Sequence, residues 1–112
     1  MRVAVFGSRT WDDTKAIKQL INDLPDGTIV VSGRASGADK MAAHYALKRG
    51  LVVVECIPPW DALGRRAGAV RNQVIVDLSD CGHAFQKNGS AGTQITIDMF
   101  ERAGKPCEIT CA

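Results

Sequence analysis

Short apolar runs alternate with amphipathic segments along almost the whole chain. The apolar runs occupy residues 3–6, 29–31, 51–54, 81–85 and 107–110, and such runs are typical of buried strands. A first helix is predicted after Asp12 or Asp13, either of which can cap it, and Pro25-Asp26-Gly27 ends it. Further helices are predicted over residues 38–49, closed by Gly50, and from about residue 64 to residue 78.

The segment before the last apolar run has an ambiguous pattern. Thr93, Ile95 and Ile97 alternate with other residues in the manner of a strand. Gly104 and Pro106, however, are the residues that commonly end a helix and follow it. We therefore predict a helix over residues 92–103, with the final strand after it.

Strand and helix thus alternate about five times. Continuous apolar strands separated by amphipathic helices indicate a parallel sheet that is covered on both faces. We predict one compact Rossmann-like α/β domain over residues 1–112, with a mainly parallel sheet of about five strands and helices on both faces. No apolar run approaches the ~18 residues that would span a bilayer, and no signal peptide is recognisable. A cytoplasmic protein without membrane association is therefore expected.

Charge and cysteine content narrow the classes of partner. The chain has 14 Lys and Arg residues against 12 Asp and Glu residues, a net charge of +2. This balance makes nucleic acid an unlikely partner, because nonspecific nucleic-acid binding usually needs a clear excess of basic residues. The four cysteines lack the spacing of a zinc site, so no metal is expected, and we predict that they are buried and reduced.

Candidate chemistry gathers in the loops that follow the predicted strands, where ligands of parallel sheets bind. Glycines let a backbone approach a ligand closely, helix N-termini favour anions, arginines bind phosphate, and tryptophans can stack on a base. These residue types together predict a pocket for a phosphorylated, nucleotide-like small molecule. The candidate ligand-binding residues are Gly7, Ser8, Arg9, Trp11, Gly33, Arg34, Gly37, Asp39, Trp60, Arg65, Arg66, Arg71, Asn72, Gly89, Ser90, Gly92 and Thr93.

Most of these candidates also have a structural explanation, which the sequence leaves open. Trp11 would then staple the first helix, and Trp60 would cover the core. Asp39 would stabilise the dipole of its helix, since it falls in the first turn. Arg65 and Arg66 would form a solvated face, and the glycines would serve only as tight turns.

Two common nucleotide-binding motifs are missing from the sequence. The first strand is not followed by G-x-G-x-x-G, and no glycine loop continues into G-K-[ST]. The sequence therefore argues against a nicotinamide-dependent dehydrogenase and against a P-loop nucleotidase. No cofactor is expected.

Four short motifs, taken in order, resemble a known family. They are Gly7-Ser8-Arg9, then Gly33 with Gly37-Ala38-Asp39, then Ala67-Gly68 with Arg71-Asn72, and finally Gly89-x-x-Gly92-Thr93. This set resembles the YspA-like branch of the SLOG superfamily, whose relatives include the LOG phosphoribohydrolases and the DprA family. The resemblance covers nearly the whole chain and implies a Rossmann-like fold that binds nucleotides or nucleotide-derived ligands. It also implies that Gly92 and Thr93 hold a phosphate at the N-terminus of the last helix.

The chain departs from the LOG enzymes at one position that matters for catalysis. Those enzymes carry a glutamate soon after the glycine-threonine pair, whereas the four residues after Thr93 include no acid. Asp98 comes five residues after Thr93, about 7.5 Å along a helix, which is too far to take over that role easily. Asp39 and Asp61 remain as weak catalytic candidates.

Three functions follow from these observations. The first is a sensor or sequestering module that binds a nucleotide-derived phosphorylated ligand. The second is an N-glycoside hydrolase acting on a nucleotide, and the third is a protein that binds single-stranded nucleic acid. The resemblance also implies a homodimer or higher homo-oligomer as an alternative to a monomer, because relatives pair through helices.

Overall fold

The sheet contains five parallel strands in the order β3-β2-β1-β4-β5. This computed structural model describes residues 1–112 except Pro59 and the side chains of Trp60 and Arg65. The strands are β1 (Arg2–Gly7), β2 (Ile29–Ser32), β3 (Val52–Glu55), β4 (Cys81–Gln86) and β5 (Cys107–Cys111). The chain moves outward from β1 to β3 and then crosses to the other side of β1. This reversal of strand order lies between β1 and β4, where ligands of such sheets bind.

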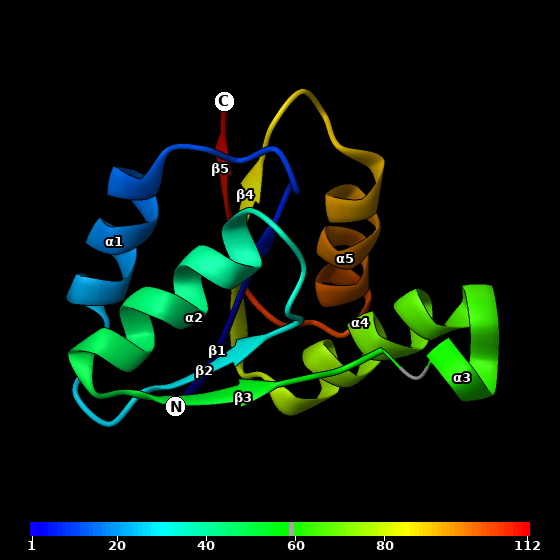
Figure 1. Ribbon diagram of the computed structural model, residues 1–112, viewed down its shortest axis with the longest axis horizontal. Coiled ribbons are helices and arrows are strands. Elements are labelled where there is room, and N and C mark those ends of the chain that lie inside the picture. The colour runs from blue at the N-terminus through cyan, green and yellow to red at the C-terminus, as the bar shows by residue number, and fades with distance from the viewer. Residues whose placement is uncertain (59) are drawn as a thin grey trace.

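Helices cover both faces of the sheet, with α1 and α2 on one face and α4 and α5 on the other (Figure 1). The helices are α1 (Thr14–Asp23), α2 (Ala38–Arg49), α3 (Trp60–Leu63), α4 (Ala67–Leu78) and α5 (Ala91–Arg102), with a 3-10 turn, η1 (Gly64–Arg66), before α4. The predicted α/β fold with a five-stranded parallel sheet is therefore confirmed. None of the helices in the described part of the chain is long and apolar enough to cross a membrane.

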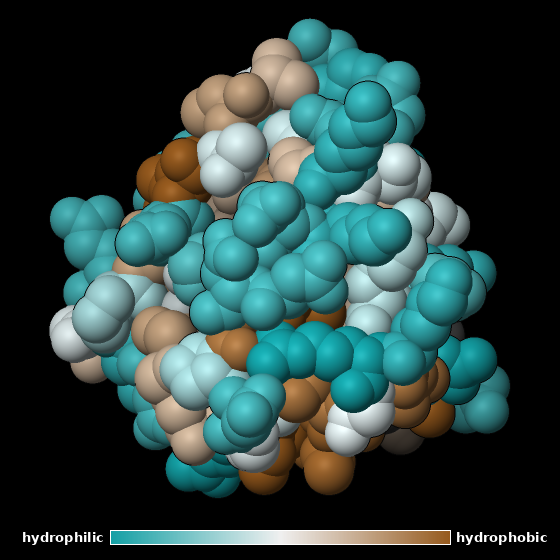
Figure 2. Space-filling view, turned by 90° about the vertical axis from the view of Figure 1, so that its left-hand side faces the viewer, coloured by the Kyte–Doolittle hydropathy of each residue, from teal (hydrophilic) through white to brown (hydrophobic). Residues whose placement is uncertain are grey.

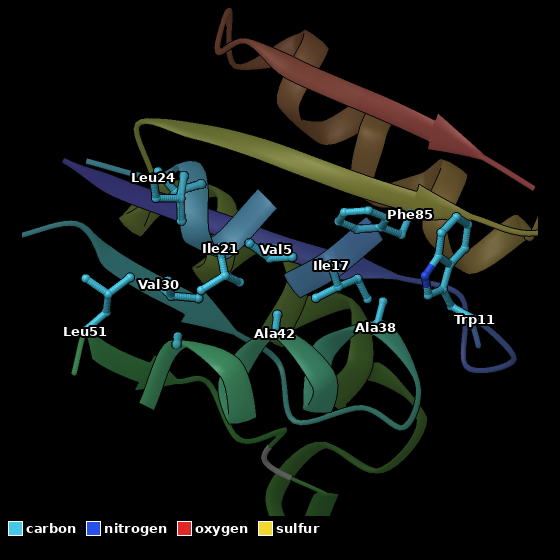
Figure 3. Packing of buried hydrophobic residues seen from close by; sticks show 12 residues of the cluster. Val5, Trp11, Ile17, Ile21, Leu24, Val30, Ala38, Ala42, Leu51 and Phe85 are labelled. Carbon is cyan, nitrogen blue, oxygen red and sulfur yellow. The ribbon is translucent and has the colours of Figure 1, made fainter. Parts of the chain in front are cut away.

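Residues of β1 alternate between the two halves of the core. Val3 and Val5 face the cluster formed with α1 and α2, part of which Figure 3 shows. Phe6 points to the opposite face, where its ring stacks on Phe100 of α5 with ring centroids 5.7 Å apart. Because β1 is central, side chains on both of its faces are buried, as its continuous apolar run predicts.

The ends of the first two helices follow from local side-chain chemistry. Asp13 caps α1, because its carboxylate accepts the backbone N–H of Ala16 at 3.2 Å. Gly50 closes α2 with φ of 88°, a conformation that glycine adopts at little cost. Figure 2 shows the side of the molecule where α1 lies, and hydrophilic side chains cover most of it. The amphipathic pattern of these helices thus separates core from solvent as expected.

The ambiguous segment before the last strand is helical, and its burial explains the misleading pattern. The buried residues of α5 are Thr93, Thr96, Ile97 and Phe100, a stripe at helical spacing. Ile95 lies off this stripe and is 51% exposed. The alternation that suggests a strand therefore includes one apolar residue that faces solvent.

Two expectations need correction. The helix predicted from about residue 64 begins only at Ala67, because Gly64 has φ of +54° and residues 64–66 form a 3-10 turn. Of the four cysteines, only Cys56 is buried, and Cys111 is exposed at the end of the edge strand β5. An edge strand has a neighbour on one side only, so apolar residues in it are not necessarily buried. All four cysteines are free thiols, as predicted.

Candidate ligand-binding site

A pocket of about 450 Å³ lies at the carboxyl ends of β1 and β4, where the strand order reverses. Four segments that are distant in sequence contribute to its lining. They are the end of β1 and the loop after it (Gly7, Ser8, Arg9 and Thr10), the loop after β2 with the start of α2 (Ala35 and Asp39), the first half of α4 (Gly68, Arg71 and Asn72), and the first half of α5 with the residue before it (Ser90, Gly92, Thr93 and Thr96). The topology therefore gathers most of the predicted motifs around one cavity.

Asp39 joins two of these segments. Its carboxylate accepts the backbone N–H of Gly7 at 3.2 Å and that of Gly33 at 3.1 Å. The side chain is buried, and burial raises the pKa of Asp39 to about 6, against the opposing effect of the Arg71 guanidinium. Asp39 therefore fixes the loops after β1 and β2 relative to α2, and its carboxyl titrates just below neutral pH.

Arg71 reaches from α4 toward the same loops. Its Nη1 donates a hydrogen bond to the carbonyl oxygen of Gly33, and its Nε donates to Oδ1 of Asn72 at 2.8 Å. A Cβ atom at Gly33 would lie 2.9 Å from Nη1 of Arg71 and equally close to Oδ2 of Asp39. Glycine is therefore needed at residue 33 for this close approach, and Asn72 orients the guanidinium.

The start of α5 presents an uncapped N-terminus to the pocket. The side chain of Ser90 makes no hydrogen bond that caps the helix. Thr93 instead donates its hydroxyl to Oγ of Ser90 at 3.3 Å and lies 3.5 Å from the hydroxyl of Ser8. A Cβ atom at Gly92 would meet nothing within 4 Å, so there is open space beside the first turn. Backbone N–H groups and hydroxyls thus meet at one end of the cavity.

Three predicted ligand-binding residues have structural roles in the fold. Trp11 is 3% exposed and packs edge-on against Phe85, so its ring is not available to stack on a base. Gly37 has φ of +78°, and a Cβ there would lie 2.5 Å from the carbonyl oxygen of Ser8. Gly89, with φ of +62°, forms the turn before α5 and does not line the described pocket. For Trp11 the alternative of a staple beside the first helix fits the structure.

The remaining predicted residues come from the loop after β2 and from the segment between β3 and α4. Arg34 lines a neighbouring pocket and forms an exposed ion pair with Glu55 at 3.2 Å. Arg66 and Asp61 are exposed, and neither is among the described residues that line the pocket. The side chains of Trp60 and Arg65 lie outside the described residues.

Sequence reasoning missed several lining residues. Thr10 and Thr96 line the cavity together with Phe6 and Ile75, and Ala35 contributes from the loop after β2. Thr96 lies one helical turn after Thr93, so helical spacing could have identified it. Within the described part of the chain, no group of three or more His, Cys, Asp or Glu side chains is placed to hold a metal ion.

Comparison with known protein families shows to which family the chain belongs. A family model described as the YspA, cpYpsA-related SLOG family matches residues 1–62, which is more than half of the 112 residues. The chain belongs to this SLOG family. The gene 61 protein of Mycobacterium phage D29 is 32% identical over 115 residues, an alignment that covers 94% of this chain and 92% of the phage protein. The predicted resemblance is therefore confirmed.

Two solved structures of DNA processing protein A (DprA) share the fold of this SLOG chain. The protein from Helicobacter pylori superimposes with a TM-score of 0.81 at 20% identity, and that from Streptococcus pneumoniae with a TM-score of 0.66 at 20% identity. The alignments cover 97% and 95% of this chain but only 64% and 57% of the DprA chains. At this identity the likeness establishes the fold alone.

These structures overturn one prediction. The net charge of the chain predicts that nucleic acid is an unlikely partner, yet the H. pylori protein with this fold binds single-stranded DNA. The prediction was wrong because the charge of a whole chain does not report how charge is distributed. Arg9, Arg34, Lys40 and Arg71 all line one pocket of this SLOG chain, although they come from separate segments.

Proposed function

We propose that this SLOG chain binds nucleotide phosphate groups at the carboxyl edge of its sheet, and that it binds its ligand without cleaving it. One observation carries the proposal. The uncapped first turn of α5, with Gly92 leaving open space, shares a pocket with the guanidinium groups of Arg9 and Arg71. Helix N-termini favour anions, and arginines bind phosphate oxygens through directed hydrogen bonds.

The hydroxyl groups at this end of the pocket support a phosphate in particular. Thr93 donates its hydroxyl to Oγ of Ser90, so the Ser90 hydroxyl, which lines the pocket beside the start of α5, keeps its own proton for a phosphate oxygen. Phosphate oxygens accept hydrogen bonds only, so hydroxyls and backbone N–H groups can serve them together. The cavity of about 450 Å³ lies within the size range of small-ligand sites.

Binding without cleavage is favoured by the position of the carboxylates. N-glycoside hydrolysis passes through a cationic transition state that needs a nearby anion. Among the described lining residues, Asp39 is the one carboxylate, and both of its oxygens already accept backbone hydrogen bonds. Asp61 is exposed and is not among those lining residues. In this proposal Asp39 therefore has a structural role, which is to hold the loops of the site in place.

Two sources of nucleotide phosphate are candidates. One is a free nucleotide or nucleotide derivative, which the volume of the pocket would accommodate. The other is single-stranded DNA, and the DprA from H. pylori, with the same fold, supports it. The likeness to that protein is one of fold, so the relative affinity for 5′-dTMP and (dT)12 decides between the two sources.

The experiment compares thymidine, 5′-dTMP and the oligonucleotide (dT)12 as ligands, with calorimetry as the readout. The wild type is expected to bind both phosphorylated ligands and not thymidine. Gly92→Ala should abolish binding without loss of stability, because the added methyl group occupies the open space and alanine favours the helix. Ala91→Ser is the matched control, since Ala91 is exposed and lies outside the described lining.

Chromatography of each mixture after incubation tests the absence of cleavage. We expect the ligands to be recovered intact, with no free thymine. Equal binding of thymidine and 5′-dTMP would contradict the phosphate site, and wild-type affinity in Gly92→Ala would contradict its location. Release of free base that Asp39→Asn abolishes would establish the hydrolase instead.

A further inference from the structure

We infer that a second pocket, beside the first, is an additional phosphate subsite, so that the ligand carries two successive phosphates of linked nucleotides. This inference rests on the proposed function and deepens it. The second pocket has a volume of about 350 Å³. Its described lining includes Arg9, Arg34, Lys40 and Arg71, together with Ser36, and contains no acidic side chain.

The two pockets adjoin. Arg9, Arg71 and Ala35 line both of them, so the two arginines stand at the boundary between the cavities. A phosphate bound at the start of α5 would contact these two arginines from the side of the first pocket. Arg34 and Lys40 line the second pocket and not the first, so a second anionic group of the same ligand would meet their cations there.

Charge is concentrated in this second pocket. The whole chain has 14 basic and 12 acidic residues, and four of the basic ones line this cavity. The remainder of the chain therefore has ten basic residues against twelve acidic ones. Grouping like charges costs electrostatic energy unless anions offset it. Glu55 pairs with Arg34, and Asp39 interacts electrostatically with Arg71, so the phosphates of a ligand would mainly offset Arg9 and Lys40.

Two of the four cations are free to meet a ligand. Arg9 and Lys40 are exposed, and neither side chain makes a hydrogen bond or ion pair with any residue that the structure describes. Arg34 is held by its ion pair with Glu55, and its φ of +60° is a conformation that non-glycine residues seldom adopt. Arg71 keeps its bond to Gly33. The pocket thus contains two cations that are held in place, Arg34 and Arg71, and two that can turn toward a ligand, Arg9 and Lys40.

A third cavity continues the path along α2. It has a volume of about 310 Å³, shares Arg34 and Lys40 with the second pocket, reaches His44, and is also lined by Glu55, which pairs with Arg34. The connected cavities leave room for a ligand that extends beyond the second phosphate. The ligand chemistry is therefore that of phosphodiester-linked nucleotides, whether from a dinucleotide or from a single strand of DNA.

The test measures the affinity of 5′-dTMP, the dinucleotide pTpT and (dT)12 for the wild type, Lys40→Ala and Lys48→Ala. Lys48 is the matched control because it is exposed in the last turn of the same helix and lines none of the three described pockets. We expect Lys40→Ala to weaken pTpT about fivefold, the scale of one exposed charge contact, and 5′-dTMP less than twofold. Lys48→Ala should change neither affinity.

The salt dependence of (dT)12 binding provides a second readout. Removal of one phosphate contact should lower the slope of log affinity against log salt by about 0.7 in Lys40→Ala. A tighter complex with (dT)12 than with pTpT identifies a DNA strand as the source, and equal affinities identify a dinucleotide. Either result supports two subsites when pTpT also binds more tightly than 5′-dTMP.

Other outcomes overturn the inference. If pTpT binds no more tightly than 5′-dTMP, and Lys40→Ala affects both alike, the second pocket is not a phosphate subsite. The proposed function would survive that result, because 5′-dTMP still binds. Failure of all three ligands to bind would instead overturn the proposed function itself.

Discussion

The backbone N–H of Gly33 donates a hydrogen bond of 3.1 Å to Oδ2 of Asp39, and this bond joins the end of β2 to the first turn of α2. The other carboxylate oxygen accepts the N–H of Gly7, at the end of β1. One buried side chain thus holds two neighbouring strand ends beside the pocket. The geometry of both loops depends on it.

The pH dependence of stability should report this carboxyl group. The pKa of Asp39 is raised from 3.8 to about 6, mainly by burial. Between these values the folded state holds a proton that the unfolded state has lost, so the contribution of Asp39 to the free energy of unfolding falls as pH rises. The total change is about 3 kcal/mol for a shift of this size.

Urea denaturation of the wild type and Asp39→Asn at pH values from 4 to 7 isolates this effect. The difference in unfolding free energy, wild type minus variant, should decrease between pH 4 and pH 6 and level off toward pH 7, because the other titrating groups cancel. A difference that is constant with pH would show that the Asp39 carboxyl has an ordinary pKa in the folded protein.

Arg71→Ala should weaken ligand binding by roughly 1.5–3 kcal/mol, the value of a charged hydrogen bond. It should also raise the pKa of Asp39 further, because Arg71 lowers that pKa in the wild type. Arg66→Ala is the matched control, since Arg66 is exposed and outside the described lining of the pocket. Calorimetry with 5′-dTMP gives the affinities, and equal losses in both variants would argue against a specific contact.

Gly37→Ala and Gly89→Ala separate backbone strain from steric overlap. Both glycines have positive φ, but a Cβ at residue 37 would lie 2.5 Å from the carbonyl oxygen of Ser8, whereas one at residue 89 would meet nothing within 4 Å. We expect Gly89→Ala to cost about 1 kcal/mol and Gly37→Ala about 3 kcal/mol or more. Urea denaturation measures the free energy of unfolding of both variants. Equal losses of stability would mean that the loop after β1 can move away from a Cβ at residue 37 at little energetic cost.

The four thiols should differ in their rates of alkylation. Cys111 is exposed, whereas Cys56 is buried. Burial, and then the neighbouring Cys81, raise the pKa of Cys107 to about 11, which leaves little of the reactive thiolate near neutral pH. Brief treatment with iodoacetamide at pH 8, followed by peptide mass spectrometry, should modify Cys111 first. Modification of Cys107 at the same rate would contradict its assigned environment.

Much of the fold could be predicted because its signals are local. The apolar runs of β1 and β2 are buried on both faces, so the pattern of each strand is nearly continuous. The caps at Asp13 and Gly50 also act within a few residues of themselves. The 3-10 turn at Gly64 was missed, since a helical stripe does not reveal a positive φ.

Features of the site that depend on distant segments were harder to predict. Trp11 is a core residue because Phe85, from β4, packs against it. Arg9, Arg34 and Arg71 were predicted to bind a ligand, but Lys40 was missed, because its place beside them depends on how β1, α2 and α4 are assembled. Net charge carries no information about that arrangement, so the argument against nucleic acid failed.

The most direct test of the phosphate site is a nuclear magnetic resonance titration of the amide-labelled protein with 5′-dTMP and, separately, with thymidine. If the start of α5 binds phosphate, the backbone amide resonances of Gly92 and Thr93 should shift with 5′-dTMP and stay in place with thymidine. Saturable binding of 5′-dTMP that leaves both amides unmoved, or equal shifts with thymidine, would contradict the account.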